Sequence, residues 1–249
     1  MRIRLAERGV RTVLLDIEGT TTPIAFVHGV LFPYARAHLR DYLRAHWRDP
    51  FTRDAIDRLA AEHMADLAAG ADPPAFATEE GATRDSVVPY IEWLMDRDRK
   101  SPGLKLLQGE IWEAGYGTGE LRGQVYDDVP RAIRRWREAG LEVAIYSSGS
   151  ERAQRRLFAS TEHGDLTPLL SGFFDTGVGG KLDSASYARV AIAMRRVAFE
   201  VLFVSDVAAE LAAARDADLQ VVLSVRPGNP AQPKAERFDS ITTFDEIEV

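Results

Sequence analysis

Two carboxylates, Asp16 and Glu18, directly follow an apolar run that ends at Leu15, in the segment VLLDIEGTTTP. Two acids two residues apart can share a hard cation, which prefers oxygen ligands. One carboxylate can also attack a phosphorus atom while the other transfers a proton. A turn cap at Asp16 beside a solvated Glu18 explains the same residues equally well. The motif by itself leaves both readings open.

Hydroxyls and a lysine lie further along the chain. Ser147 and Ser148 follow a second apolar run, in VAIYSSGS, and Lys181 follows a glycine-rich stretch, in DTGVGGKLDSASY. Hydroxyls and N–H groups at a strand-to-helix turn can bind a phosphate oxygen. A lysine can contact a phosphate as a point charge, or keep a nucleophilic carboxylate ionised. Taken singly, a helix cap and a solvated surface lysine are the commoner explanations.

Asp206 ends a third apolar run, in VLFVSDVAAEL, and Glu210 lies one helical turn later. Asp206 could complete an oxygen-rich metal site with Asp16 and Glu18, or it could cap the alanine-rich helix that follows. We expect Glu210 to support this site only weakly. The chain thus carries, in this order, an acidic nucleophile, hydroxyls, a lysine and a further acid. This combination predicts a phosphoryl-transfer site.

Four apolar runs predict the strands that position these residues: 13–15, 143–146, 201–204 and 219–225. They lack the period-2 alternation of a half-solvated sheet, which favours a parallel sheet covered on both faces. Helical patterns separate the runs, so we expect a doubly wound α/β fold. Ligands of such folds bind at the carboxyl ends of the strands, where the candidate residues fall.

Capping residues predict where several helices begin and end. Ser150 can cap one helix, and Asp183 or Ser184 can cap a second. Pro130 suits the first position of a third helix, and Gly140 is placed to end it. All three helices fall within the expected α/β core.

Residues 25–122 interrupt this alternation with aromatic residues at helical spacing and no convincing strand. We therefore expect an α/β core domain formed by residues 1–24 and 123–249, with a helical domain of residues 25–122 inserted into it. The segment GYGTGE within the insertion lacks the final glycine and the preceding strand of a dinucleotide-binding turn.

Composition excludes several classes of protein. The 249 residues are 45% hydrophobic and 28% charged, which is typical of a globular protein. Cysteine is absent, which excludes disulfides, thiol nucleophiles and thiolate metal sites. A net charge of −7 argues against nucleic-acid binding. No apolar stretch has the length of a membrane span, and no secretory leader is evident, so we expect a cytoplasmic protein without membrane contacts.

The chain resembles the haloacid-dehalogenase-like (HAD-like) hydrolases, and more closely the enolase-phosphatase (acireductone synthase) family of methionine salvage. Five segments carry the resemblance: DIEGTTTPIAFVHGVLFPYA, LQGEIWEAGYGTGEL, VPRAIRRWREAGLEVAIYSSGS, DLTPLLSGFFDTGVGGKLDSASY and LFVSDVAAELAAA. The resemblance to enolase-phosphatases rests in part on Glu18, since the wider superfamily usually has Asp at this position and enolase-phosphatases have Glu. The resemblance implies a Rossmannoid core and identifies the helical insertion as a cap over the substrate.

The resemblance also implies roles for the residues of the site. Asp16 corresponds to the nucleophile and a metal ligand, and Glu18 to the general acid/base at the metal. Asp206 corresponds to a further ligand of one Mg²⁺ per chain. Lys181 matches a position that binds substrate and takes part in catalysis. For the proton removed from carbon, Glu18 and a metal-linked carboxylate are both candidates.

Ser147 and Ser148 match further substrate-binding positions of the family. The implied reaction enolises 2,3-diketo-5-methylthiopentyl-1-phosphate, a small-molecule phosphate. It then releases phosphate to give the acireductone 1,2-dihydroxy-3-keto-5-methylthiopentene. A capped phosphatase for another small phosphate ester and a non-catalytic binding module of the same fold are the alternatives. The resemblance suggests a monomer.

Overall fold

The computed structural model of the chain describes residues 2–77, 84–97, 99 and 101–249. It divides into two compact units, one formed by Met1–Val27 and Leu121–Val249 and the other by His28–Glu120. The boundaries expected from the sequence, 24/25 and 122/123, fall within a few residues of these crossings.

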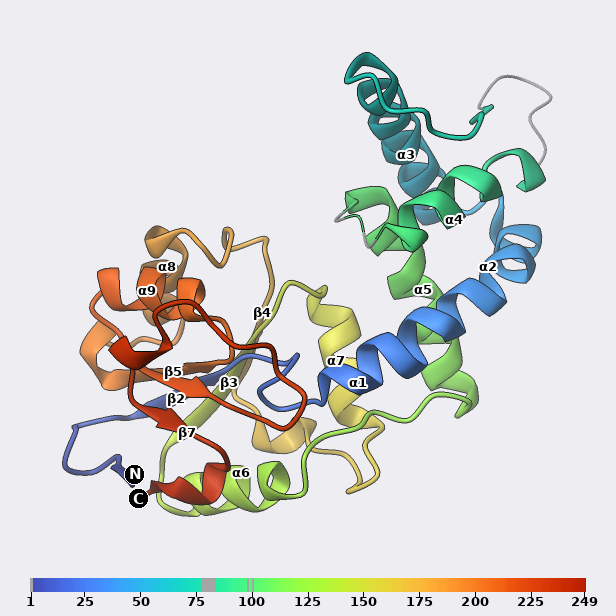
Figure 1. The fold of residues 1–249 in the computed structure, drawn as a ribbon. Helices are drawn as coiled ribbons and strands as arrows, with labels where there is room; N and C mark the ends of the chain where they lie inside the picture. Colours follow the sequence, from blue (N-terminus) through green and yellow to red (C-terminus); the bar gives the residue numbers. More distant parts are fainter. Residues whose placement is uncertain (1, 78–83, 98, 100) are drawn as a thin grey trace. The chain divides into compact units, whose positions relative to one another are not determined.

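The first unit contains a six-stranded parallel sheet in the order β4-β3-β2-β5-β6-β7 (Figure 1). Its strands are β2 (Thr12–Leu15), β3 (Glu142–Tyr146), β4 (Gly172–Phe174), β5 (Val201–Ser205), β6 (Gln220–Ser224) and β7 (Ser240–Ile241). The four strands predicted from apolar runs are β2, β3, β5 and β6, which confirms them. The sequence does not predict β4 and β7, because two or three residues carry too short a pattern. A separate parallel pair, β1 (Ile3–Arg4) and β8 (Ile247–Glu248), joins segments near the two ends of the chain.

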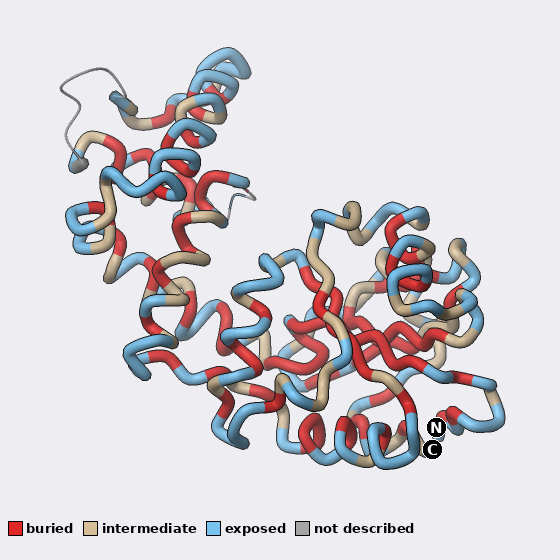
Figure 2. Tube along the Cα trace, turned by 180° about the vertical axis from the view of Figure 1, so that it is seen from behind, coloured by how far each residue is buried: buried red, intermediate tan, exposed pale blue. Residues whose placement is uncertain are grey.

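Helices lie on both faces of this sheet. The helices α8 (Ser184–Ala193) and α9 (Ala208–Asp216) cover one face, and α6 (Asp128–Glu138) covers the other (Figure 1). Leu14 pairs in register with Ala144 and Phe203, and this row packs into one cluster with apolar residues of α8 and α9. The central strands are accordingly buried, as the red segments in Figure 2 show. The doubly wound α/β fold is confirmed.

Three helix ends of the core unit lie at or near the predicted capping residues. Ser150 Oγ accepts a hydrogen bond from the Ala153 N–H at the start of α7 (Glu151–Ala159), at 3.2 Å. Asp183, rather than Ser184, caps α8. Gly140 follows the last residues of α6 with φ of +81°, as predicted. The start of α6 was predicted wrongly, because the helix begins at Asp128 and Pro130 is its third residue.

The second unit packs four longer helices around an apolar core. They are α2 (Phe32–His46), α3 (Pro50–Ala68), α4 (Val88–Asp96) and α5 (Pro102–Thr118). Among the described residues of this unit no strand occurs, as expected, and the segment GYGTGE lies at the end of α5.

Short helical segments occur in both units. They are α1 (Ile24–Phe26), a π-helix at Val27–Leu31 and 3-10 turns at Arg84–Ser86, Thr167–Leu169, Ala198–Glu200, Ala235–Arg237 and Phe244–Glu246. No helix in the described part of the chain combines the length and apolar character needed to cross a membrane.

Candidate active site

Three neighbouring strands bring candidate residues to one edge of the sheet. Asp16 directly follows β2, Ser147 follows β3 and Asp206 follows β5. Because these strands are parallel and adjacent, their carboxyl ends lie at the same edge, where α/β proteins bind ligands. Asp16, Ser147 and Asp206 are buried, whereas Ser148 is exposed.

Lys181 lies between two carboxylates at this edge. Its Nζ atom is 2.5 Å from Asp16 Oδ1 and 2.5 Å from Glu210 Oε2. The side chains of Lys181, Asp16 and Glu210 are only 8%, 6% and 13% exposed. Ser205 Oγ donates a further hydrogen bond to Glu210 Oε2 at 2.9 Å. A buried ion pair is weak evidence for a stabilising role, so this arrangement is better explained by chemistry at Asp16.

Two tyrosines fix the loop that carries Lys181. Tyr146, at the end of β3, donates from its hydroxyl to the carbonyl of Gly179 at 2.8 Å. Tyr187 of α8 donates to the carbonyl of Lys181 itself at 2.7 Å. The lysine backbone is therefore tied to a strand and a helix of the core, which places its ammonium group against Asp16.

Electrostatics at this edge favour a bound cation. Burial lowers the pKa of Lys181, but the charges of Asp16 and Glu210 outweigh it, so the net pKa lies above its ordinary value. Burial and the charge of Asp16 raise the pKa of Asp206 to about 7. Burial and the same charge raise the pKa of Glu210 to about 7. When all four groups are ionised, three carboxylates share a single ammonium group, which leaves an excess of negative charge.

The turn after Asp16 brings Gly19 close to Asp206. The N–H groups of Thr20, Thr21 and Thr22 all donate to the carbonyl of Ile17, at 2.9–3.2 Å. Gly19 has φ of +69°, and a Cβ atom there would lie 2.4 Å from Asp206 Oδ2. This position therefore requires glycine, both for its backbone conformation and for the close approach.

Glu18 lies on the same turn, and its side chain is exposed. Thr21 Oγ1 donates to the backbone carbonyl of Asp16 at 3.0 Å, which links the turn to the residue at the end of β2. Glu18 is thus carried by a segment that contacts both Asp16 and Asp206. Its acid/base role stays a prediction, as do the substrate contacts of Ser147 and Ser148.

Glu210 lies closer to the site than its sequence context predicts. The only signal is its spacing of four residues from Asp206, which would put both residues on one side of a helix that began at Asp206; in the structure α9 begins at Ala208. In the structure Glu210 contacts Lys181 directly. The alternative of a helix cap at Asp206 is not realised, because Val207 occupies the cap position of α9 and no side chain caps it.

The donor set fits Mg²⁺. This ion usually binds through one or two carboxylates, keeps several waters and takes further oxygens from a phosphate substrate. Asp16 and Asp206 supply two buried carboxylates. Burial and the charge of Asp16 raise the pKa of Asp206, and a bound divalent cation would favour its ionised form. In the described ranges no three His, Asp or Glu side chains converge to hold a metal by themselves.

Comparisons with known proteins agree with this site. The family model of haloacid dehalogenase-like hydrolases matches residues 10–218. A protein of Synechococcus elongatus named Enolase-phosphatase E1 is 49% identical over 96% of this chain and 98% of its own length. A protein of the same name from Salmo salar is 44% identical, over 95% of this chain and 94% of its own. The chain belongs to the enolase-phosphatase family of HAD-like hydrolases.

Two further matches place this enolase-phosphatase among its relatives. The crystal structure of the Unknown transcript 4 protein of Saccharomyces cerevisiae has a TM-score of 0.73 and 32% identity, covering 95% of this chain and 99% of that one. A Populus trichocarpa protein is 45% identical over 95% of this chain, which spans 47% of its length. Its name is "Probable bifunctional methylthioribulose-1-phosphate dehydratase/enolase-phosphatase E1".

Proposed function

We propose that this chain converts 2,3-diketo-5-methylthiopentyl-1-phosphate to the acireductone 1,2-dihydroxy-3-keto-5-methylthiopentene and phosphate, in methionine salvage. The reaction enolises the diketone first and removes the phosphoryl group second. The observation that carries the proposal is the buried contact of Lys181 with Asp16, at the strand edge that also holds Asp206. Family membership narrows this phosphoryl-transfer site to the enolase-phosphatase reaction.

Asp16 is the nucleophile in the proposed phosphoryl transfer. Its carboxylate oxygen forms a bond to phosphorus as the bond from phosphorus to the enol oxygen breaks. Glu18 donates a proton to the leaving oxygen, and later accepts one from the water that hydrolyses the phospho-aspartyl group. Lys181 keeps Asp16 ionised and offers positive charge to the phosphoryl oxygens. Ser147 and Ser148 bind the phosphate at the end of the neighbouring strand.

Asp16, Glu18 and Asp206 would hold one Mg²⁺ per chain. When bound, the ion supplies positive charge that offsets the charge of the phosphoryl group and of the developing enolate. Asp206 and Asp16 contribute the buried carboxylates of this set. Glu18 is exposed on its turn and therefore accessible to substrate as an acid or base.

The name of the plant relative supports the diketone as substrate. It joins an enolase-phosphatase to a dehydratase of methylthioribulose-1-phosphate in one chain. Loss of water from carbons 3 and 4 of that ketose phosphate gives an enol, which tautomerises to a 2,3-diketone with its phosphate still on carbon 1. The product of such a dehydratase is thus the substrate proposed for this chain.

Residues 25–122 would act as a cap that excludes water from the enediol intermediate. The catalytic side chains named above all come from one unit of one chain, which supports a monomeric enzyme. We place this enzyme in the cytoplasm, and sedimentation of the purified chain tests the monomer.

An anaerobic assay tests the reaction. Purified protein, Mg²⁺ and the diketone phosphate are mixed, and free phosphate and the enediol absorbance are followed together, with a chelator as control. We expect equal amounts of both products, and neither in chelator. Phosphate release from generic esters without enediol from the diketone would replace the proposal with a capped phosphatase of another substrate.

A further inference from the structure

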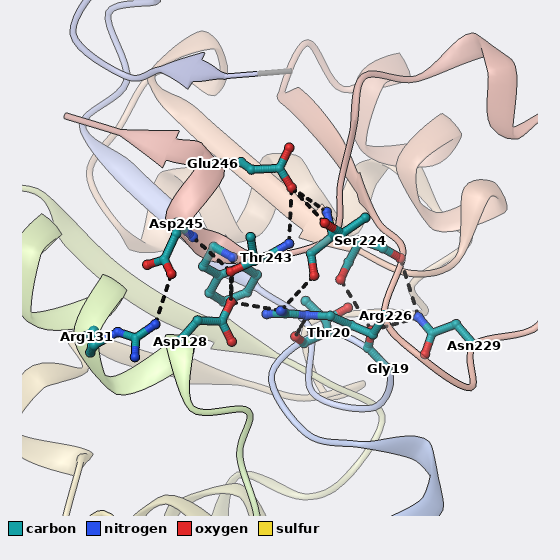
Figure 3. Close-up of polar contacts among 12 residues, drawn as sticks. Gly19, Thr20, Asp128, Arg131, Ser224, Arg226, Asn229, Thr243, Asp245 and Glu246 are labelled. Atoms are coloured by element: carbon teal, nitrogen blue, oxygen red, sulfur yellow. Dashed lines mark hydrogen bonds and ion pairs between the residues drawn. The ribbon is translucent and has the colours of Figure 1, made fainter.

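The turn that carries Glu18 is held by side chains from a distant part of the sequence. The carbonyl of Gly19 accepts hydrogen bonds from Asn229 Nδ2 at 2.8 Å and from Ser224 Oγ at 3.3 Å. The next carbonyl, of Thr20, accepts a hydrogen bond from Arg226 Nε at 3.2 Å (Figure 3). All three donors belong to the end of β6 and the loop that follows it.

Arg226 is itself held by further contacts, made by its Nη1 atom and by the two faces of its guanidinium group. Its Nη1 atom donates to Asp128 Oδ2 at 2.8 Å and to the carbonyl of Thr242 at 3.0 Å. The guanidinium carbon lies 4.4 Å from the ring centre of Tyr126 and 4.6 Å from that of Phe244. The side chain is only 3% exposed. A planar group held by two rings and three acceptors has little freedom to move.

Asp128 connects Arg226 to two further elements. It belongs to the first turn of α6, and its Oδ2 atom accepts hydrogen bonds from Thr243 Oγ1 at 2.9 Å and from the Phe244 N–H at 2.5 Å (Figure 3). Arg226 therefore connects the turn of Glu18 to α6 and to the segment after β7. Replacing such a buried ion pair by apolar groups often costs no stability, so stability alone does not explain its presence.

The position of this turn matters for the reaction. Gly19 approaches Asp206 so closely that a Cβ atom would lie 2.4 Å from Asp206 Oδ2 and 3.1 Å from Asn229 Nδ2. A shift of the turn therefore moves Glu18 relative to both Asp16 and Asp206. A misplacement of about 1 Å in a catalytic constellation can reduce the rate about 100-fold.

We propose that Arg226 and Asn229 are positioning residues of the phosphoryl-transfer site. They hold the carbonyls of Thr20 and Gly19, and this fixes the turn that carries Glu18, two residues after Asp16. Neither residue acts on the substrate. This inference rests on the proposed function, which supplies the reaction whose rate is measured.

Two variants and a matched control test the proposal. Asn229→Ala removes one donor to the turn without removing a charge. Arg226→Lys keeps a positive charge for Asp128 but loses the planar fork that reaches Thr20 as well. The control is Arg135→Lys, because Arg135 donates to the carbonyls of Phe244 and Ile247 at 3.0 Å, within the same C-terminal segment, and makes none of the contacts with the turn described here.

We expect kcat for the diketone phosphate to fall about 10- to 100-fold in Asn229→Ala and Arg226→Lys, with KM changed less than about 3-fold. Arg135→Lys should keep kcat within about 2-fold even if its unfolding midpoint falls. Equal losses of kcat in all three variants would overturn the proposal, because they would show a general effect on the fold.

Hydrogen exchange supplies a readout that needs no substrate or metal. The N–H groups of Thr20, Thr21 and Thr22 bond to the Ile17 carbonyl, so their exchange reports opening of the turn. We expect faster exchange there in Asn229→Ala and Arg226→Lys, but not in Arg135→Lys. Unchanged exchange in both variants would overturn the inference. The wild-type chain could fail to act on the diketone while hydrogen exchange in the variants still changes as expected. In that case the proposed function would be wrong, and the result would still support the inference that Arg226 and Asn229 hold the turn.

Discussion

The substitution Gly19→Ala adds one methyl group where the turn of Glu18 meets Asp206. The new Cβ atom would lie 2.4 Å from Asp206 Oδ2 and 2.7 Å from its Cγ atom. Ordinary contact begins near 3.4 Å, so the turn and the carboxylate must separate by about 1 Å. The positive φ of Gly19, +69°, adds conformational strain for any residue with a Cβ atom.

The two effects have different magnitudes and different readouts. Strain in the left-handed region costs about 1–2 kcal/mol and lowers the free energy of unfolding. Displacement of the turn by about 1 Å is expected to lower kcat about 100-fold, which corresponds to about 2.7 kcal/mol of transition-state stabilisation. The variant should thus fold while losing nearly all of its turnover.

Gly140→Ala is the matched control. Gly140 has φ of +81°, and among the described residues no atom beyond its immediate chain neighbours lies within 4 Å of the Cβ atom that would be added. This variant carries the same kind of strain at the end of α6 without a clash at the site. We expect a similar loss of stability in urea unfolding, with kcat for the diketone phosphate unchanged.

The assay measures anaerobic phosphate release under saturating Mg²⁺ and substrate for wild type, Gly19→Ala and Gly140→Ala. Urea unfolding of the same preparations confirms that each variant is folded. A folded Gly19→Ala protein with more than about half of the wild-type kcat would refute the reasoning, because the close approach of Gly19 to Asp206 would then not be needed for catalysis.

Three further predictions concern charged groups. Asp16→Asn should abolish phosphate release while circular dichroism stays unchanged, and turnover by a folded variant would disprove the nucleophile. Glu210→Gln removes one of the two carboxylates on Lys181 and should lower kcat up to about 100-fold with the fold intact, as steady-state kinetics would show. Burial raises the pKa of Asp128, but hydrogen bonds from Arg226 and the Phe244 N–H outweigh it and lower the net pKa. The stabilisation by Asp128 is therefore present above its ordinary pKa of about 3.9 and is lost as pH falls through the lower folded value. Asp128→Asn should cost about 3–5 kcal/mol at pH 7 and much less near pH 2 in urea unfolding, and an equal loss at both would contradict this sign.

The sequence by itself determines the central strands and the residues that end them. The apolar runs of β2, β3 and β5 are continuous, because both faces of the parallel sheet are covered. Since side chains after parallel strands gather at one edge, Asp16, Ser147 and Asp206 can be assigned to one site before any coordinate is known. The family resemblance, carried by segments from both halves of the chain, extends this to Glu18 and Lys181.

Only the tertiary structure decides which groups touch. Local patterns in the sequence do not reveal that Glu210 shares Lys181 with Asp16, or that Arg226 joins Asp128 to the turn at Thr20. These contacts join residues far apart in the sequence, and their distances depend on the packing of whole strands and helices. Periodicity and capping report interactions within a few residues, so they predict elements and leave side-chain partners across the sheet undetermined.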